Sequence, residues 1–131
     1  MIPTQTQAKA LWDKYHLPQQ KRLHVTLVAE VAVGLARQCQ MPNAKCQINE
    51  QLLLAGALLH DIDKNAAKLP GEQHPDTAVR ILNTEGMEEV AALVKAHPLH
   101  AILDPLTAPK TWEEKILFLA DKMVKYKIIG V

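Results

Sequence analysis

Three apolar segments of the chain each carry a metal-binding side chain at a position where an aliphatic residue would be expected. His60-Asp61 closes the apolar run 52–59, His24 lies in an earlier apolar stretch, and Asp121 lies in a later one. An ionised Asp is rarely buried in an apolar stripe unless it is paired or binds a metal, because its loss of solvation outweighs any packing gain. The pattern therefore predicts a shared cation, and His and carboxylate ligands together indicate hydrolytic chemistry.

The size and composition of the chain narrow the class of protein. With 131 residues, we expect one domain, residues 1–131, with a core of its own. The net charge of +1 gives no general attraction to nucleic acid or membranes, although it allows a local basic pocket for phosphate. Cys39 and Cys46 suit neither a disulfide scaffold nor a C-x-x-C motif. Residues 1–5 lack a signal-peptide pattern, and no apolar run approaches the ~20 residues of a membrane span. We therefore expect a cytoplasmic protein with reduced thiols.

Apolar residues recur at helical spacing, and no stretch alternates apolar and polar residues. The sequence thus predicts an all-α protein, a compact bundle of about six helices. Asn49 and Thr111 are the expected N-caps, with Glu114 completing a capping box, and Pro75 is expected in a first turn. The predicted helices cover residues 4–15, 19–38, 49–61 and 87–96. A further helix is expected to begin at 74–76 and end at 83–86, and another follows residue 111. The second carries apolar residues at Leu23, Leu27, Val28, Val31 and Leu35.

Five candidate sites share a predicted helix face with apolar residues, and each also has a structural interpretation. His24 could be a core histidine, and His60-Asp61 could be a helix end with its capping residue. Asp121 could pair with a buried Lys or Arg, His74 could start a helix, and His97 could interact with a helix dipole. All five structural interpretations would have to hold independently, so the joint pattern favours a metal site.

The order of these residues resembles the H…HD…D order of the HD-domain metal-dependent phosphohydrolase superfamily. The similar strings are 23–29, 57–64 (of H-D-I-G-K type) and 115–122, and the resemblance covers about residues 22–125. It implies the HD-domain fold. It also implies that a first metal is bound by His24, His60, Asp61 and Asp121, and that a second is completed by His74 and His97 with Asp61 bridging. His100 could orient substrate or be a solvated loop residue.

One residue departs from the family pattern. The Gly usual before the Lys of H-D-I-G-K is Asp63 here. Gly often serves a positive φ or a close approach, and Asp tolerates left-handed geometry better than most residues. The turn is therefore expected to survive, while a second carboxylate could alter phosphate affinity or metal choice.

Mixed imidazole and carboxylate ligands suit Mn²⁺, Fe²⁺, Co²⁺ or Zn²⁺ better than Ca²⁺. The resemblance implies two divalent ions, with iron or manganese favoured and Co, Zn, Mg or Ni as alternatives. A bound metal lowers the pKa of water and supplies hydroxide near neutral pH. The catalytic candidates are Asp61 and Lys64, the latter as a positive group near phosphate or, alternatively, a solvated loop lysine. The chain has no G-x-x-x-x-G-K and no G-x-S-x-G motif.

These observations predict a metal-dependent phosphohydrolase that cleaves a phosphate ester or anhydride of a small substrate, expected to be a nucleotide. Among relatives, the H…HD…H…H…D order and the string 113–121 look like the bacterial HD-type symmetrical dinucleoside tetraphosphate hydrolases. A non-catalytic nucleotide- or metal-sensing module and a purely structural bundle are the alternatives. We expect no duplex nucleic acid or membrane partner. The apolar residues in 126–131 could pack on the bundle or form a homodimer contact.

Overall fold

The computed structural model of the protein describes residues 2–39, 48–96 and 110–125. Within these residues it contains six helices and no strand, which confirms the predicted all-α fold. The predicted boundaries agree with the observed helices to within two residues at most ends. The helices are α1 (Gln5–Lys14), α2 (Gln19–Cys39), α3 (Glu50–Leu59), α4 (Asp76–Thr84), α5 (Glu88–Lys95) and α6 (Trp112–Lys125). None of the described helices combines the length and apolarity that a bilayer-spanning helix needs.

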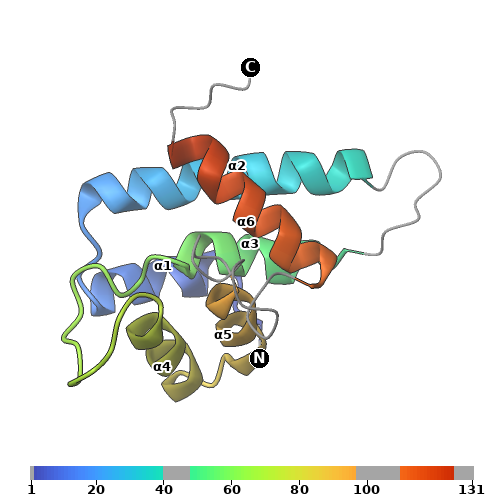
Figure 1. Ribbon diagram of the computed structural model, residues 1–131. Helices are drawn as coiled ribbons and strands as arrows, with labels where there is room; N and C mark the ends of the chain where they lie inside the picture. Colours follow the sequence, from blue (N-terminus) through green and yellow to red (C-terminus); the bar gives the residue numbers. More distant parts are fainter. Residues whose placement is uncertain (1, 40–47, 97–109, 126–131) are drawn as a thin grey trace.

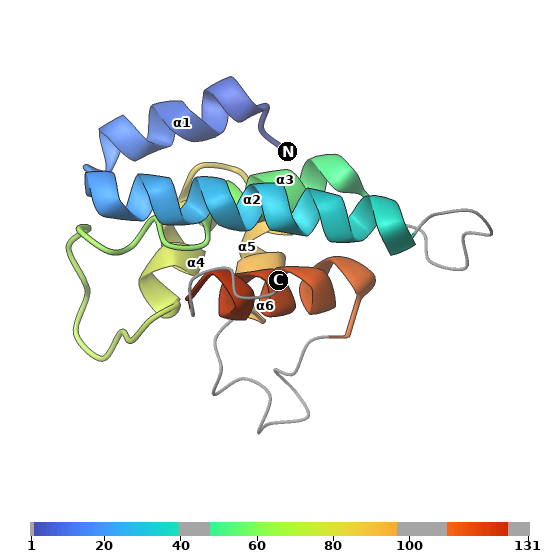
Figure 2. The same cartoon turned by 90° about the horizontal axis from the view of Figure 1, so that it is seen from above.

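The long helix α2 is the axis of the arrangement. It packs most extensively on α3 and α6, and α6 crosses it at a steep angle in Figure 1. Helices α4 and α5 form a second pair, and α5 joins it to α3 and, less extensively, to α6. Helix α1 packs on α3, and the turned view shows α1 and α6 on opposite sides of α2 (Figure 2). Helix α3 therefore contacts α1, α2, α5 and α6, and His60, which caps its C-terminal end, is fully buried.

The helix starts follow the local signals in the sequence. Thr4 and Gln7 form a reciprocal capping box at α1. The side chain of Asn49 accepts a 3.1 Å hydrogen bond from the Leu52 amide, and Thr111 accepts one of the same length from Glu114. Both predicted N-caps are thus confirmed. Pro75 lies at the N-cap position of α4, just before the first turn in which it was predicted.

The apolar stripe of α2 seen in the sequence is buried only in part: Val28 lies in the core, and Val31 and Leu35 pack against it. Leu23 and Leu27 are 60% and 37% exposed, so they do not belong to the core. Small side chains of α2 face the core instead of these leucines. The small side chains allow α3 and α6 to approach α2 closely. The leucines and the smaller residues both recur at helical spacing, and size alone does not show which stripe is covered. The buried residues of α2 are Val25, Val28, Ala29, Ala32 and Ala36.

Gly56 sets the distance between α3 and its neighbours. It is buried, and a Cβ added there would overlap Leu93 Cδ2 of α5 and lie 3.6 Å from Leu117 Cδ2 of α6. The absence of a side chain at this position therefore allows α3 to pack tightly against both helices. Because α3 leads into His60 and α6 carries Asp121, this close approach also sets the separation between those two residues.

Helix α1 holds the two segments that lead to the candidate site. The indole nitrogen of Trp12 donates a buried 2.9 Å hydrogen bond to the carbonyl of Leu58, near the end of α3. Arg22, two residues before His24, donates to the carbonyls of Leu17 at 2.8 Å and Trp12 at 3.1 Å. These bonds fix the start of α2 and the end of α3 relative to one another.

Candidate metal centre

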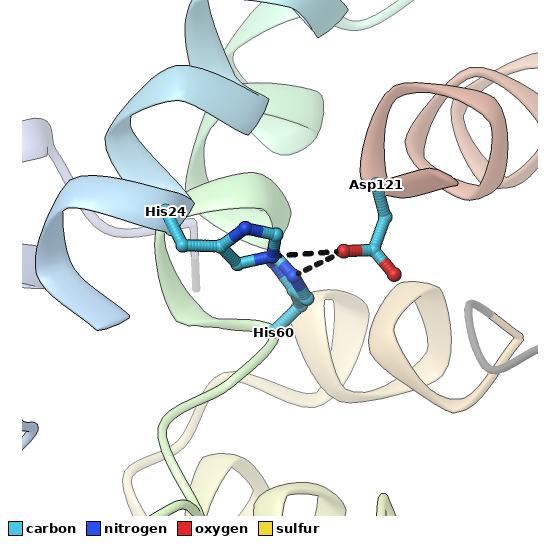
Figure 3. A group of neighbouring side chains, drawn as sticks. All are labelled: His24, His60 and Asp121. Carbon is cyan, nitrogen blue, oxygen red and sulfur yellow. Dashed lines mark hydrogen bonds and ion pairs between the residues drawn. The ribbon is translucent and has the colours of Figure 1, made fainter. Parts of the chain in front are cut away.

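Three helix-supported side chains converge at the centre of the bundle, and we call them the helix-borne cluster: His24 from α2, His60 at the end of α3, and Asp121 from α6. The Nε2 atoms of His24 and His60 lie 3.0 Å and 3.2 Å from the same oxygen, Oδ1 of Asp121. Figure 3 shows both rings directed at that carboxylate. The structure therefore brings together three residues that are up to 97 positions apart in sequence.

The contacts of His60 leave a position for a cation. Its Nδ1 lies 2.7 Å from the carbonyl oxygen of Ala57, which can only accept, so Nδ1 carries the proton. Nε2 of the neutral ring then presents a lone pair to a carboxylate oxygen of Asp121. Two lone pairs at this distance repel unless a proton or a metal ion lies between them. Burial by itself lowers the pKa of His60, but the negative charges of Asp61 and Asp121 outweigh it and raise this pKa overall.

Asp61 lies between two groups of side chains. Its Oδ2 is 3.6 Å from Nε2 of both His24 and His60, whereas its Oδ1 is 3.9 Å from Nε2 of His74. Each carboxylate oxygen thus faces a different group. This arrangement is compatible with the bridging role predicted for Asp61, which stays a prediction.

The second group, which we call the turn cluster, consists of Asp61, Asp63 and His74. It comes from the turn after α3 and the segment just before α4, and its potential ligand atoms all lie within 4.8 Å of one another. Asp63 Oδ2 lies 2.7 Å from His74 Nδ1. Asp63 does not adopt the left-handed conformation considered for it, because His16 is the only non-glycine residue with a positive φ in the described part of the chain.

The residues of both clusters suit a divalent cation. Asp61, Asp63 and Asp121 are at most 8% exposed, and three carboxylates so close together repel one another without positive charge between them. Asp63 Oδ1 is buried and has no hydrogen-bond partner among the described residues. Imidazole and carboxylate donors in this number are typical of Mn, Fe, Co or Zn sites. Their metal-binding role nevertheless stays a prediction, since geometry alone identifies no ion.

Two lysines lie at the edge of the clusters. Lys64 Nζ is 4.0 Å from Asp61 Oδ1, so the predicted catalytic lysine is beside the site. Lys122 was not predicted, yet its Nζ lies 3.1 Å from Asp121 Oδ2 and 4.7 Å from the ring centroid of Phe118. Its position directly after a proposed ligand was the only sequence signal that could have identified it.

Several other residues named from the sequence lie outside the described part of the chain, and two glutamates have structural roles. His97 and His100 lie outside the described residues, as do Cys46 and residues 126–131. In the string that resembles the tetraphosphate hydrolases, Glu113 accepts a 2.8 Å hydrogen bond from the Asn49 amide, and Glu114 accepts from Thr111 at 3.1 Å. Both glutamates therefore stabilise helix starts, and their presence does not distinguish between substrates.

Comparison with known proteins gives one match. The family model described as the HD domain matches residues 23–125, which include all the clustered residues above. No match was found among curated proteins or among solved structures.

Proposed function

The chain belongs to the HD-domain family, most of whose members are metal-dependent hydrolases, and we propose that it is a metal-dependent phosphohydrolase. One observation carries the proposal. Nε2 of His24 and of His60 lie 3.0 Å and 3.2 Å from Asp121 Oδ1, and both face Asp61 Oδ2 at 3.6 Å. Two imidazoles and two buried carboxylates around one small space suit a divalent ion.

The side chains divide into two ligand sets in this proposal. His24, His60 and Asp121 would hold a first ion together with Asp61. Asp61 would reach a second ion through its other oxygen, with His74 and the predicted ligand His97. When bound, such ions lower the pKa of coordinated water and provide a nucleophile near neutral pH.

The protein's own residues supply the remaining requirements for phosphoryl transfer. Lys64 and Lys122 place two ammonium groups at the rim, where they would attract phosphate oxygens and offset charge developing on them. The hydrogen bond from His60 Nδ1 to the Ala57 carbonyl keeps Nε2 directed into the site. Burial of Asp61 and Asp121 excludes bulk water from their oxygens and strengthens their interaction with cations.

We propose a small phosphorylated molecule as substrate, with nucleotides as the first class to test. The resemblance to HD-type symmetrical dinucleoside tetraphosphate hydrolases makes these dinucleotides the leading specific candidate. Iron or manganese is the proposed metal, and two ions per chain the proposed stoichiometry.

The decisive experiment combines metal analysis with turnover. Protein purified anaerobically and reconstituted with Mn²⁺ or Fe²⁺ is analysed for bound metal, then assayed on p-nitrophenyl phosphates, mononucleotides and symmetrical dinucleoside tetraphosphates. We expect metal-dependent release of phosphate or nucleotide, abolished in Asp61→Ala. Glu30→Gln, which removes an exposed carboxylate of α2, should keep full activity and serves as the matched control.

The alternatives give different outcomes. Metal binding with no turnover on any substrate would replace the proposal with a non-catalytic sensing module. The absence of bound metal after reconstitution would favour a structural bundle. Activity that survives in Asp61→Ala would remove Asp61 from the mechanism.

A further inference from the structure

We propose that Asp63 is a positioning residue that holds His74 in the tautomer and orientation needed for metal binding. This inference rests on the proposed function, because it concerns the second metal site. It starts from the residue that departs from the H-D-I-G-K pattern. Asp63 is 1% exposed, and its Oδ2 lies 2.7 Å from His74 Nδ1.

The chemistry of the contact fixes the direction of the hydrogen bond. A carboxylate is an acceptor, so the proton belongs to His74 Nδ1. The neutral ring then carries its lone pair on Nε2, the atom that faces Asp61 Oδ1 at 3.9 Å. A carboxylate that accepts from the remote nitrogen of a metal-binding His orients the ring and raises its basicity.

His60 provides an internal parallel. Its Nδ1 is held by the carbonyl of Ala57, three residues earlier and in the last turn of α3. His74 precedes α4 and has no preceding helical turn to supply such a carbonyl. The carboxylate of Asp63, from a different segment, occupies the corresponding position. The two histidines thus reach the same tautomer by different means.

The surroundings of Asp63 make the contact stable. The Ala66 amide donates a 3.2 Å hydrogen bond to the Asp63 carbonyl, which closes the turn on itself. The side chain of Asn65 donates to the carbonyl of His16 at 3.1 Å and fastens the turn to the end of α1. A glycine at position 63 would leave both of these hydrogen bonds in place and remove only the acceptor for His74.

The first test observes the tautomer in the metal-free protein. At about pH 8, above the ordinary imidazole range, ¹⁵N-edited NMR of the ring nitrogens should show His74 protonated on Nδ1. The His74 signals are assigned by their absence in His74→Asn. Asp63→Ala and Asp63→Gly should shift the ring towards the Nε2-protonated form, whereas Glu30→Gln, at an exposed position of α2, should leave it unchanged. A wild-type His74 protonated on Nε2, or a tautomer unaffected by Asp63→Ala, would overturn the inference.

The second test measures metal affinity with Mn²⁺ titrations. Loss of a carboxylate that supports a metal ligand typically weakens binding by 10–100-fold, so Asp63→Ala should weaken the second ion by roughly that factor and leave the first unchanged. Asp63→Asn retains an oxygen that accepts from Nδ1 and should recover part of the affinity. If the Asn variant binds the second ion as poorly as the Ala variant, Asp63 is itself a ligand and the positioning role is wrong.

The two tests separate this inference from the proposed function. A wild-type protein that binds no metal would refute the proposed phosphohydrolase, while the NMR experiment would still decide whether Asp63 sets the tautomer. Circular dichroism and melting temperatures of every variant establish that a change at His74 is not a consequence of unfolding.

Discussion

The helix-borne cluster and the turn cluster share Asp61 but are built by different means. In the helix-borne cluster, each ligand candidate comes from a helix or its end, and those helices pack through the central core. In the turn cluster, Asp63 and His74 come from segments between helices, and a hydrogen bond between side chains keeps them together. The first arrangement depends on packing, and the second depends on polar contacts.

This difference predicts that the two clusters respond unequally to substitutions and to the loss of metal. Core packing is dense and tolerates little displacement, so His24, His60 and Asp121 should keep their positions with or without metal. The segment that leads to His74 is instead braced by Glu72, which accepts hydrogen bonds from Arg80 at 2.8 Å and from Thr77 at 2.8 Å. Sites of this second kind respond to single polar substitutions.

The largest expected effect separates the two clusters by their histidines. His24→Ala removes a ligand of the proposed first ion, and we expect turnover to fall by more than the roughly 100-fold loss typical of supporting residues. His74→Ala should release only the second ion, with a smaller loss of turnover. Metal content per chain and phosphohydrolase rates measure both effects.

His16→Ala is a useful control for these variants, because His16 lies at the end of α1 and is exposed. It should retain wild-type metal content and turnover. Equal losses of metal and turnover in His24→Ala and His74→Ala would contradict the division into one cluster fixed by core packing and another that depends on polar contacts.

A pair of glycine variants tests the packing of the helix-borne cluster. Ala is favoured over Gly by about 1 kcal/mol within a helix, and this gain applies to Gly34→Ala and Gly56→Ala alike. No atom lies within 4 Å of a Cβ added at Gly34, whereas one at Gly56 meets Leu93. Overpacking typically costs 1–3 kcal/mol, so the free energies of unfolding of the two variants should differ by about that amount, with Gly56→Ala the less stable. Urea titrations measure the difference, and equal stabilities would show that Leu93 adjusts freely.

The sequence predicted the helix-borne cluster because helical periodicity and caps are local properties. Spacing showed that His24, His60 and Asp121 share faces with apolar residues, and apolar faces must meet in a core. The same reasoning did not show that Leu23 and Leu27 lie outside the core, because periodicity does not reveal which of two apolar stripes a neighbouring helix covers.

The turn cluster was predicted only in part. Asp63 was interpreted through backbone conformation and as a second carboxylate that could alter phosphate affinity or metal choice, but its contact with His74 across an irregular loop was not predicted. No sequence period fixes the distance between two residues separated by such a loop. Lys122 was overlooked because neighbouring helix positions point in different directions, and only its long side chain allows it to return to Asp121.

Two helix ends of the same geometry offer a smaller test that touches no ligand. After α1 and after α4, the chain passes through a positive φ, at His16 (56°) and at Gly86 (79°), with matching backbone hydrogen bonds. A side chain in this conformation costs roughly 1 kcal/mol. His16→Gly should therefore raise the free energy of unfolding by up to about 1 kcal/mol, and Gly86→Ala should lower it by a similar amount. Both should bind metal as the wild type does, and weaker binding in Gly86→Ala would show that α4 stability also controls His74.

The smallest expected effect concerns the brace of the turn cluster and depends on pH. Hydrogen bonds from Arg80 and from the Leu69 amide lower the pKa of Glu72 from its ordinary value of 4.5 to about 2. A carboxyl group whose pKa is lower in the folded protein stabilises the fold at pH values above its unfolded pKa, and this contribution disappears as the pH falls towards the folded value. Glu72→Gln should therefore melt below the wild type at about pH 7, and the gap should close between about pH 4.5 and pH 2.

Glu30→Gln, at an exposed position of α2, controls for the change in charge. If Glu72 braces the turn cluster and not the whole fold, Glu72→Gln should also weaken the second ion more than the first at neutral pH. A gap in melting temperature that stays constant down to pH 2 would mean that the Glu72–Arg80 contact does not contribute in solution. Equal weakening of both ions would mean that the helix-borne cluster depends on the same loop, and the contrast between the two clusters would then be wrong.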